Sequence, residues 1–425
     1  MASSSTDATV PMPGGYGDQT ADATASATQK ELFYSPASEE LIASRKFLCE
    51  YSFPRTKARL EKTRAIRSDP VQQAAEDQRT AELYLSLKDM HLNGSQFGDN
   101  RPLTCVRYSP DAKIVASSSL NPEIKLWNSD TLEHVGSLCA HEERVTSLAW
   151  RPQTDSSQPT ILATSSADGK CYLWDCRNIV SEGSNNDSSS PMEEDSEKPV
   201  INGTDESTST TPVLKTPLCT LGGHEGTVTR CSFHPSGFYV GTTGEDFTWR
   251  LWDVEMNTEL LLQDGHIKGC DAIAFHHDGS LLLTGDLGGL ALLWDLRSGQ
   301  CVQAFQGHIK KIVSASFNPN GFQVATGSTD NMARIWDLRS KKCGYALPAH
   351  SKSISDVRYS SSGESLTTCS FDGTVKVWNA RNFDILRTLS GHSGKVMSCD
   401  ISHDEKNIIS GGFDRTIKSW AKDSF

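Results

Sequence analysis

Two groups of side chains in this sequence have the types and spacing that chemistry uses. His392, Ser410 and Asp414 supply the imidazole, hydroxyl and carboxylate of a hydrolytic triad, in which the imidazole accepts the proton of an attacking hydroxyl. His276 and His277 are adjacent imidazoles, and imidazole nitrogen is a common metal ligand. The sequence contains no G-x-x-x-x-G-K-[ST] loop for nucleotide phosphates. What these residues do depends on the elements that position them.

The residue types of the apparent triad recur along the chain, which indicates an internal repeat. Five tryptophans are evenly spaced, and two more continue the series upstream: Trp252, Trp294, Trp336, Trp378 and Trp420, with Trp174 and Trp127. In the six units after the first, a His precedes the Trp at one constant spacing, which an insertion lengthens in the second unit. A Ser or Thr stands at a fixed position before each Trp, and in five of these units an Asp stands at a second fixed position between them.

Five units contain the complete set of four residues. The sets are His141, Thr164, Asp168 and Trp174; His224, Thr242, Asp246 and Trp252; His308, Thr326, Asp330 and Trp336; His350, Thr368, Asp372 and Trp378; and His392, Ser410, Asp414 and Trp420. Because the set recurs, the apparent triad has a structural explanation, and the sequence predicts no catalytic residue and no enzyme. His276 and His277 occupy the same turn as FHPSG and FNPNG in neighbouring units, so we expect a loop pair, no metal site and no cofactor.

Each unit has the pattern of short strands. In GFQVATGSTDNMARIWDL, two apolar stretches of strand length flank a turn at Asp330 and Asn331. A unit of about 40 residues with Gly-His near its start and Trp-Asp near its end resembles the WD repeat, in which four strands form one propeller blade. The resemblance implies an all-β, seven-bladed WD-repeat β-propeller over residues 92–425. It also implies that the His, Ser or Thr, Asp and Trp of a unit form one buried hydrogen-bonded chain.

Two units depart from this pattern. The first has Asp99 where the His is expected and Asn121 where the Asp is expected. The fourth has Gly288 at the Asp position but keeps His266 and Thr284. We therefore expect these two blades to be looser or to be braced by other residues.

The last unit is too short to form a whole blade. The chain ends so soon after Trp420 that no room is left for a fourth strand. We expect Leu92–Gln96, before the first blade, to supply that strand. This pairing would remove two exposed sheet edges at once.

The remaining segments have the composition of appendages. Residues 1–30 are rich in Ser, Thr, Ala and Gly and are predicted to be disordered, and residues 31–91 are predicted to be a basic helical extension. In that extension, Ser35-Pro36 is expected to start a first helix, Pro54 to end it and start a second, and Asp69-Pro70 to start a third that runs to about Met90. Residues 179–214 are predicted to be an acidic, disordered insert between blades 2 and 3.

Charge is unevenly distributed along the chain, whose formal net charge is −12. Residues 181–213 carry eight acids and one Lys, whereas residues 45–67 carry eight bases and two acids. A nucleic-acid partner is therefore compatible with the sequence. The candidate partner or RNA contacts lie in two places. Four are in the basic helical segment 45–67, the helical arm: Arg55, Lys57, Arg59 and Arg64. Six are in the loops that follow the repeated His, which we expect to form one rim of the propeller: Arg144, Lys268, Lys310, Lys311, Lys352 and Lys395. The alternatives are a helix that only braces the propeller and lysines that only solvate its surface.

The sequence favours an intracellular location. A membrane helix needs about 18 apolar positions or more, and no apolar run in the sequence approaches that length. The N-terminus has neither the basic start nor the apolar centre of a signal peptide, and the absence of Arg before Arg45 argues against a mitochondrial transit peptide. The twelve cysteines contain no C-x-x-C pair and are expected to fill apolar space in a reducing compartment. These features favour the cytosol or the nucleus.

Five stretches are more specific than the general repeat. YSFPRTKARLE, SQFGDNRPLT, TWRLWD, FQGHIK and GHSGKV resemble the WD-repeat proteins of the spliceosomal U4/U6 small nuclear ribonucleoprotein, the pre-mRNA-processing factor 4 family. The resemblance runs from about residue 31 to the end, and GDNRP replaces Gly-His in the first unit where that family has a similar string. Members of the family carry a further N-terminal charged helical region with a short splicing-factor motif, where this chain has a low-complexity stretch.

This resemblance implies a nuclear, non-catalytic scaffold in pre-mRNA splicing. Such a protein belongs to the U4/U6 particle and the U4/U6.U5 tri-snRNP, docks a partner splicing factor and a cyclophilin, and supports U4/U6 snRNA binding directly or through that partner. The alternatives are a WD-repeat substrate adaptor of a ubiquitin ligase, or another protein-interaction scaffold, and a propeller-based enzyme. An enzyme would need acids or metal ligands that converge at the channel mouth, and the sequence does not indicate them.

Overall fold

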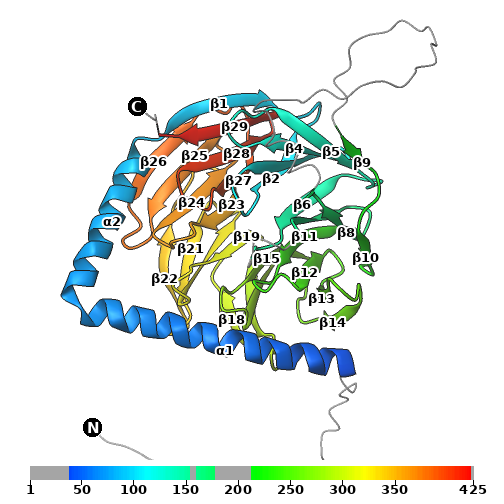
Figure 1. The fold of residues 1–425 in the computed structure, drawn as a ribbon, viewed down its shortest axis with the longest axis horizontal. Coiled ribbons are helices and arrows are strands. Elements are labelled where there is room, and N and C mark those ends of the chain that lie inside the picture. The colour runs from blue at the N-terminus through cyan, green and yellow to red at the C-terminus, as the bar shows by residue number, and fades with distance from the viewer. Residues whose placement is uncertain (1–37, 154–158, 178–211, 423–425) are drawn as a thin grey trace, which may run out of the picture. The chain divides into compact units, whose positions relative to one another are not determined.

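The structure, a computed structural model, describes residues 38–153, 159–177 and 212–422. Within these ranges, seven sheets surround a central axis as the blades of a propeller, and two helices precede them (Figure 1). All pairings inside the blades are antiparallel apart from one short parallel edge strand. The predicted seven-bladed propeller is therefore confirmed.

Blades 1 to 3 follow one another along the chain. Blade 1 contains β2 (Leu103–Tyr108), β3 (Ile114–Ser119), β4 (Glu123–Asn128), β5 (His134–Cys139) and the edge strand β9 (Val213–Leu214). Blade 2 contains β6 (Val145–Trp150), β7 (Ile161–Ser166), β8 (Lys170–Asp175) and β10 (Cys219–Gly222). Blade 3 contains β11 (Val228–Phe233), β12 (Tyr239–Gly244), β13 (Trp249–Asp253) and β14 (Glu259–Gln263).

Blades 4 to 7 complete the ring. Blade 4 contains β15 (Cys270–Phe275), β16 (Leu281–Asp286), β17 (Leu290–Asp295) and β18 (Gln300–Gln306). Blade 5 contains β19 (Ile312–Phe317), β20 (Gln323–Ser328), β21 (Ala333–Asp337) and β22 (Lys342–Leu347). Blade 6 contains β23 (Ile354–Tyr359), β24 (Ser365–Ser370), β25 (Thr374–Asn379) and β26 (Ile385–Ser390). Blade 7 contains β27 (Val396–Ile401), β28 (Asn407–Gly412), β29 (Thr416–Ala421) and β1 (His91–Phe97).

Neighbouring blades are held together by apolar side chains that alternate along their strands. Between blades 4 and 5, Phe305, Ile312, Phe317, Val324 and Trp336 belong to one cluster, and all are buried. Burying a side chain of this size stabilises the fold by about 1.5–3 kcal/mol. The repeated tryptophan therefore packs between sheets, and its indole N–H needs a buried acceptor.

The ring closes through a strand from the N-terminal side of the propeller. β1 pairs antiparallel with β29, from His91 opposite Ala421 to Phe97 opposite Thr416. Lys418 Nζ also donates to Ser95 Oγ at 2.9 Å. The expected pairing of Leu92–Gln96 with the last blade is confirmed.

Two helices precede β1, where the sequence predicted three. α1 (Glu39–Ser68) continues through Pro54, so the predicted break at that residue is wrong. A proline inside a helix removes one backbone hydrogen bond and costs about 3 kcal/mol. Contacts with the propeller on both sides of Pro54 offset this loss: Leu48 and Ser52 are buried before it, and Arg59 is bound after it. α2 (Pro70–Lys88) begins where predicted, because Asp69 Oδ1 accepts from the backbone N–H of Val71 as its N-cap.

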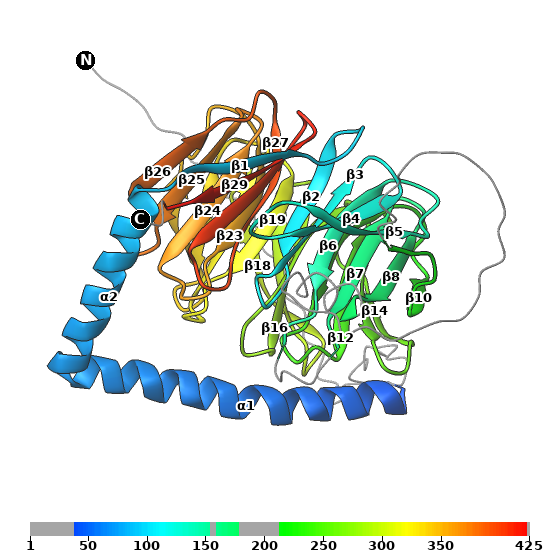
Figure 2. The same cartoon turned by 45° about the horizontal axis from the view of Figure 1, so that its top comes forward.

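α1 docks on the turns of blades 3 to 5 through apolar and charged contacts (Figures 1 and 2). The Phe47 ring lies 5.6 Å from the Phe238 ring, edge to face. Arg59 Nη2 lies 2.8 Å from Asp278 Oδ2, and Thr56 Oγ1 donates to the same oxygen at 2.9 Å. Burial alone would raise the pKa of Asp278, but the hydrogen bond from Arg59 and the other neighbouring donors and charges outweigh it and lower that pKa. The arm is thus fixed to the propeller by a largely buried ion pair.

α2 runs beside β26 of blade 6 (Figures 1 and 2). Tyr84 Oη donates to Asn379 Oδ1 at 2.8 Å, and Arg381 Nη1 lies 2.7 Å from Asp77 Oδ1. Leu87 is buried in the cluster that joins blades 6 and 7. The two helices and β1 therefore contact blades 3 to 7 in succession.

Several predictions fall on residues outside the described ranges. These are the disordered stretch 1–30, the helix start at Ser35-Pro36 and most of the acidic insert 179–214. The end of that insert differs from the prediction, because Val213 and Leu214 form β9, which pairs in parallel with Ser137 and Leu138. No helix in the described ranges is both long and apolar enough to cross a membrane. The twelve cysteines are all free thiols there.

We predict that Asp278→Asn loosens α1 from the propeller. The change removes a charge that Arg59 contacts where both side chains are largely buried, so the free energy of unfolding should fall by about 1.5–3 kcal/mol. Urea denaturation measures the loss, and hydrogen exchange should accelerate in residues 55–66. Glu61→Gln is the control, because the exposed Lys57–Glu61 pair should contribute less than about 0.5 kcal/mol. Unchanged exchange in α1 of Asp278→Asn would contradict the prediction.

Candidate functional site

In blades 2 to 7 a hydrogen-bonded series of four side chains crosses the repeat, and blade 5 shows its geometry. Trp336 Nε1 donates to Thr326 Oγ1 at 2.9 Å. The same hydroxyl oxygen lies 2.8 Å from His308 Nε2, and His308 Nδ1 lies 2.8 Å from Asp330 Oδ2. Asp330 Oδ2 also accepts from the backbone N–H of Ile309 at 3.2 Å. The chain therefore connects the buried indole to the loop that follows the His.

The structure brings the four residues together in blades 2, 3, 6 and 7 as well. The distance from His Nδ1 to the Asp carboxylate is 2.9–3.1 Å, and His Nε2 lies 2.7–2.8 Å from the hydroxyl oxygen. The indole N–H donates to that oxygen at 2.8–3.0 Å. All five complete sets that the sequence contains thus have one geometry.

The histidines of four blades are neutral near pH 7. Burial lowers the pKa of His224, His308, His350 and His392. Neutral imidazole fixes the direction of the chain: Nδ1–H donates to the carboxylate, and Nε2 accepts from the hydroxyl. Burial would raise the pKa of the Asp partners, but hydrogen bonds and charge from the His, with backbone and hydroxyl donors, outweigh it and lower that pKa in Asp246, Asp330, Asp372 and Asp414.

Blade 4 is braced by a residue that the sequence analysis missed. Asp286 takes the place of the expected Asp, with Oδ2 3.4 Å from His266 Nδ1. Its Oδ1 accepts from the backbone N–H groups of Gly288 at 2.8 Å and Leu290 at 2.9 Å. The carboxylate of blade 4 therefore stands two residues before the expected position, which Gly288 occupies. The sequence signals this shift, because blade 4 has TGD where blade 5 has TGS. This blade has the same chain as its neighbours.

Blade 1 replaces the imidazole by a carboxylate. Asp99 Oδ2 accepts from Ser119 Oγ, and from Asn121 Nδ2 at 2.9 Å. Trp127 Nε1 donates to Ser117 Oγ at 2.8 Å, as in the other blades. Both departures noted in the sequence are thus compensated by other hydrogen bonds, and the expected alternative bracing is present.

The two groups that suggested chemistry are used in hydrogen bonds within the fold, with Ser410 and His276 buried and His277 exposed. Ser410 is buried, and its Oγ accepts from Trp420 Nε1 at 2.8 Å. His276 Nε2 lies 3.3 Å from Gly321 O, and His277 Nε2 lies 3.3 Å from Phe317 O, so both imidazoles face backbone carbonyls. Among the residues described, no group of three or more His, Cys, Asp or Glu side chains is placed to hold a metal ion.

We call the four hydrogen-bonded side chains of a repeat its tetrad. The loops that follow the tetrad histidines meet at one mouth of the central channel. A cavity of about 470 Å³ at this mouth is lined by residues of all seven blades. The first strand of each blade after its loop, such as β2 or β6, lies nearest the channel and is called its inner strand. Hydroxyls at the start of inner strands connect adjacent blades: Thr104 Oγ1 donates to Val145 O at 2.8 Å, and Thr146 Oγ1 donates to Val228 O at 2.6 Å. Adjacent blades are therefore joined by hydrogen bonds at this mouth.

The six predicted rim cations lie in these loops. Lys311 Nζ lies 3.2 Å from Asp271 Oδ2 of the neighbouring blade, so part of its charge is used inside the protein. Lys395 Nζ lies 4.9 Å from the centre of the Phe371 ring. The remaining four are exposed: Arg144, Lys268, Lys310 and Lys352. The corresponding loops of blades 2 and 3 carry the exposed acids Glu142, Glu143 and Glu225, so the rim is basic mainly from blade 4 to blade 7.

Two apolar side chains stand beside the lysines, and the sequence analysis missed them. Ile267 is 85% exposed and Ile309 is 84% exposed, each directly between a tetrad His and a Lys. Isoleucine is among the residues most often buried, so these two side chains on adjacent blades are added to the candidate partner contacts. The repeated tripeptide His-Ile-Lys, at residues 266–268 and 308–310, was the available signal.

The helical arm contributes fewer free charges than the sequence suggested. Arg59 was predicted as a partner contact, but it is bound to Asp278 and to the backbone carbonyl of Asn320. Arg55 is exposed, with its guanidinium over the Tyr51 ring. The two remaining candidates, Lys57 and Arg64, are exposed on α1. The arm therefore braces the propeller with one basic residue and presents the others to solvent.

Comparison with known proteins agrees with the repeat. The model of the WD domain, G-beta repeat, matches residues 91–128, 132–175, 215–253, 258–295, 299–337, 341–379 and 383–421. The chain is similar to the U4/U6 small nuclear ribonucleoprotein PRP4 of Saccharomyces cerevisiae, with 33% identity over 242 residues, which cover 55% of this chain and 43% of that protein.

Two further relatives are similar over shorter stretches. An uncharacterized WD repeat-containing protein, C227.12, of Schizosaccharomyces pombe is 37% identical over 224 residues, which cover 52% of this chain and 40% of that protein. The U4/U6 small nuclear ribonucleoprotein Prp4 of Homo sapiens is 34% identical over 128 residues, or 30% of this chain and 24% of that protein. The matched part is thus less than half the length of each of these relatives, and the resemblance predicted from the sequence is confirmed.

We predict that Thr326→Val destabilises the protein. Valine has the shape of threonine but leaves Trp336 Nε1 and His308 Nε2 without their buried partner. Because one unpartnered buried polar group costs about 1–3 kcal/mol, the free energy of unfolding should fall by about 2 kcal/mol or more. Urea denaturation measures it. The matched control is Thr388→Val on the exposed face of β26, which should change stability by less than about 0.5 kcal/mol. Equal stability of the two variants would refute the role of the hydroxyl.

We also predict a loss of stability as the pH falls below about 6.5, the ordinary pKa of histidine. Four tetrad histidines have a lowered pKa in the folded protein, so the unfolded chain binds protons that the folded protein does not. Each of these histidines lowers the free energy of unfolding by up to about 1.4 kcal/mol per pH unit, until the pH reaches the pKa of that histidine in the folded protein. The urea midpoint should therefore fall from pH 7 to pH 5, and less steeply in His308→Gln. A constant midpoint over this range would contradict the prediction.

Proposed function

Because this chain belongs to the WD-repeat family, and PRP4 proteins of the U4/U6 small nuclear ribonucleoprotein are among its relatives, we propose that it is a non-catalytic scaffold in pre-mRNA splicing. In this proposal it is a nuclear component of the U4/U6 particle and of the U4/U6.U5 tri-snRNP. It holds partner splicing proteins, a cyclophilin among them, and supports binding of U4/U6 snRNA directly or through a partner.

The observation that carries this proposal is the rim of blades 4 and 5. Ile267 and Ile309 are exposed in the loops there, and Lys268 and Lys310 follow them. An apolar centre with a charged border is the usual composition of a protein-binding surface. The lysines favour a partner with acidic residues around an apolar contact, because opposite charges increase the rate of association.

The arm supports a second contact, with phosphate groups or an acidic protein surface. Arg55, Lys57 and Arg64 are exposed on α1, which is held in place by the Arg59–Asp278 pair. Since these charges are fixed relative to the propeller, they and the rim can engage one particle at two places. Neutralising phosphates in this way gives binding that weakens as salt increases.

The competing functions differ in what they bind. A substrate adaptor of a ubiquitin ligase would associate with a ligase subunit and not with U4 or U6 RNA. A propeller-based enzyme would need reactive groups open to a substrate. In the described residues of blades 2 to 7, the histidine, hydroxyl and carboxylate of the repeat are used in hydrogen bonds inside the fold. This arrangement favours the scaffold.

We predict that the tagged protein recovers U4 and U6 RNA from nuclear extract. RNA sequencing of the recovered material measures the enrichment over total nuclear RNA. The double change Lys268→Glu and Lys310→Glu should reduce the amount of partner protein recovered with the tagged chain about tenfold or more, because like charges across an interface oppose association. Ligase subunits in place of spliceosomal proteins, or absence of both RNAs, would reject the splicing function.

The control for the rim variant changes two lysines outside the rim. Lys113→Glu and Lys406→Glu lie on exposed turns that follow the inner strands of blades 1 and 7, so they make the same change in net charge. Recovery with this control should equal that of the unchanged protein. Equal losses in the two double variants would show that net charge, and not the rim, controls the association.

A further inference from the structure

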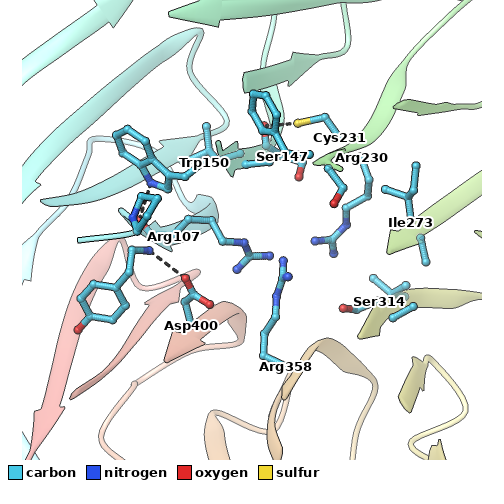
Figure 3. Close-up of a pocket in the computed structure, with 18 residues that line it drawn as sticks. Arg107, Ser147, Trp150, Arg230, Cys231, Ile273, Ser314, Arg358 and Asp400 are labelled. Atoms are coloured by element: carbon cyan, nitrogen blue, oxygen red, sulfur yellow. Dashed lines mark hydrogen bonds between the residues drawn. The ribbon is translucent and has the colours of Figure 1, made fainter. Parts of the chain in front are cut away.

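Three arginines from three blades converge inside the central channel. Arg107 comes from β2 of blade 1, Arg230 from β11 of blade 3 and Arg358 from β23 of blade 6. Figure 3 shows their guanidinium groups pointing toward one another across a cavity of about 240 Å³. Like charges repel at such a site unless anions balance them. The question is therefore which negative charges the channel supplies.

The positive charge of Arg107 is balanced by a carboxylate of the protein, Asp356. Its Nη2 lies 2.9 Å from Asp356 Oδ2, and its Nη1 donates to Ser398 Oγ at 2.8 Å and to Cys399 O at 3.1 Å. Asp356 also accepts from Ser314 Oγ at 2.7 Å. Burial alone would raise the pKa of Asp356, but the neighbouring arginines outweigh it and hold that pKa far below its ordinary value. The side-chain hydrogen bonds to this carboxylate come from Arg107 and from two hydroxyl groups, and not from Arg230 or Arg358.

Arg358 and Arg230 have no comparable partner among the described residues. The nearest carboxylate oxygen to Arg358 Nε is Asp356 Oδ1 at 3.7 Å, and that Nε has no hydrogen bond. Arg230 Nη2 reaches only the carbonyl of Ser355, at 3.4 Å. Burial and the neighbouring Arg107 cation lower the pKa of Arg358, which reports an environment short of negative charge. A guanidinium carries five N–H donors, so most of those donors remain available to a ligand.

The second carboxyl of the channel does not balance these charges. Asp400 accepts from the backbone N–H of Tyr108 at 2.9 Å (Figure 3), and burial raises its pKa. Even when Asp356 and Asp400 are both ionised, the three guanidinium groups outnumber the two carboxylates. The channel therefore has a net positive charge in a partly enclosed space, where an uncompensated charge is costly.

The geometry points to an anion site: we propose that Arg230 and Arg358, with Arg107 behind them, bind a small phosphate-type oxyanion in the channel. The planar guanidinium binds the oxygens of phosphate in pairs, and charge-assisted hydrogen bonds of this kind are strong. The oxyanion supplies acceptors for the free N–H groups and the missing negative charge. This inference concerns the isolated chain and does not depend on splicing partners.

A ligand can reach this site from the rim. Arg230 and Val313 line both this cavity and the larger one at the mouth that the tetrad loops surround. The two cavities therefore meet at Arg230, inside one channel. Tyr108, Trp150 and Phe233, at the ends of three inner strands, line the opposite end of the site. The oxyanion is either free in solution or a phosphoryl group on a side chain that enters from the rim.

Isothermal titration calorimetry tests the site with the full chain in chloride buffer. Inorganic phosphate should bind at one saturable site, and sodium chloride at the same ionic strength should not. Arg358→Met and Arg230→Met should each weaken binding about tenfold or more, because each removes charge-assisted hydrogen bonds. Asp400→Asn should tighten binding, since it removes a like charge near the anion. O-phosphoserine distinguishes the sources: binding as tight as that of phosphate indicates a phosphorylated side chain, and weaker binding indicates the free anion.

The controls separate loss of the site from loss of the fold. Arg387→Met removes an exposed arginine of β26 and should bind phosphate as the unchanged protein does. The Asp400→Asn variant is expected to bind phosphate more tightly, and a misfolded variant cannot produce that gain of affinity. The proposal is overturned if phosphate gives no saturable heat beyond chloride, if both arginine variants bind as tightly as the unchanged protein, or if Asp400→Asn weakens binding.

Discussion

In six of the seven blades, the structure depends on one hydroxyl oxygen that has two buried partners. In blade 5, Thr326 Oγ1 accepts from the indole of Trp336 and donates to the imidazole of His308. Indole and imidazole both have to be satisfied when buried, since an unpaired polar group there costs more than a hydrogen bond contributes. The carboxylate at the end of the chain then fixes the loop that carries Ile309. An internal hydrogen-bond requirement therefore determines the position of exposed side chains.

The N-terminal extension is part of the propeller and not a separate attachment. α1 contacts the turns of blades 3 to 5, α2 contacts blade 6, and β1 supplies the outer strand of blade 7. The Arg59–Asp278 pair holds the middle of this path. A basic segment that resembled a free arm in the sequence is thereby fixed, and its remaining exposed cations have defined positions relative to the rim.

The sequence was sufficient where the determining contacts are local or repeated. Seven units, the N-cap at Asp69 and the closing strand all follow from spacing and from the need to cover sheet edges. It was insufficient where a distant residue decides the outcome. Pro54 stays helical because α1 is docked on both sides of it, and Arg59 is bound to Asp278, 219 residues away. Asp286 was missed because the carboxylate shifts by two residues, and the arginines of the channel converge only after the ring closes.

The closing strand also constrains how the chain reaches this state. Lys418 and Ser95, which meet in blade 7, are 323 residues apart in the sequence. During synthesis on the ribosome, β1 therefore emerges long before β29 exists, and its unpaired edge has to remain soluble until the final blade appears. Contacts of such long range slow folding and leave strand edges open to aggregation. Helices that already anchor β1 beside the nascent sheets would shorten this search, because they would keep β1 close to the place where β29 has to pair.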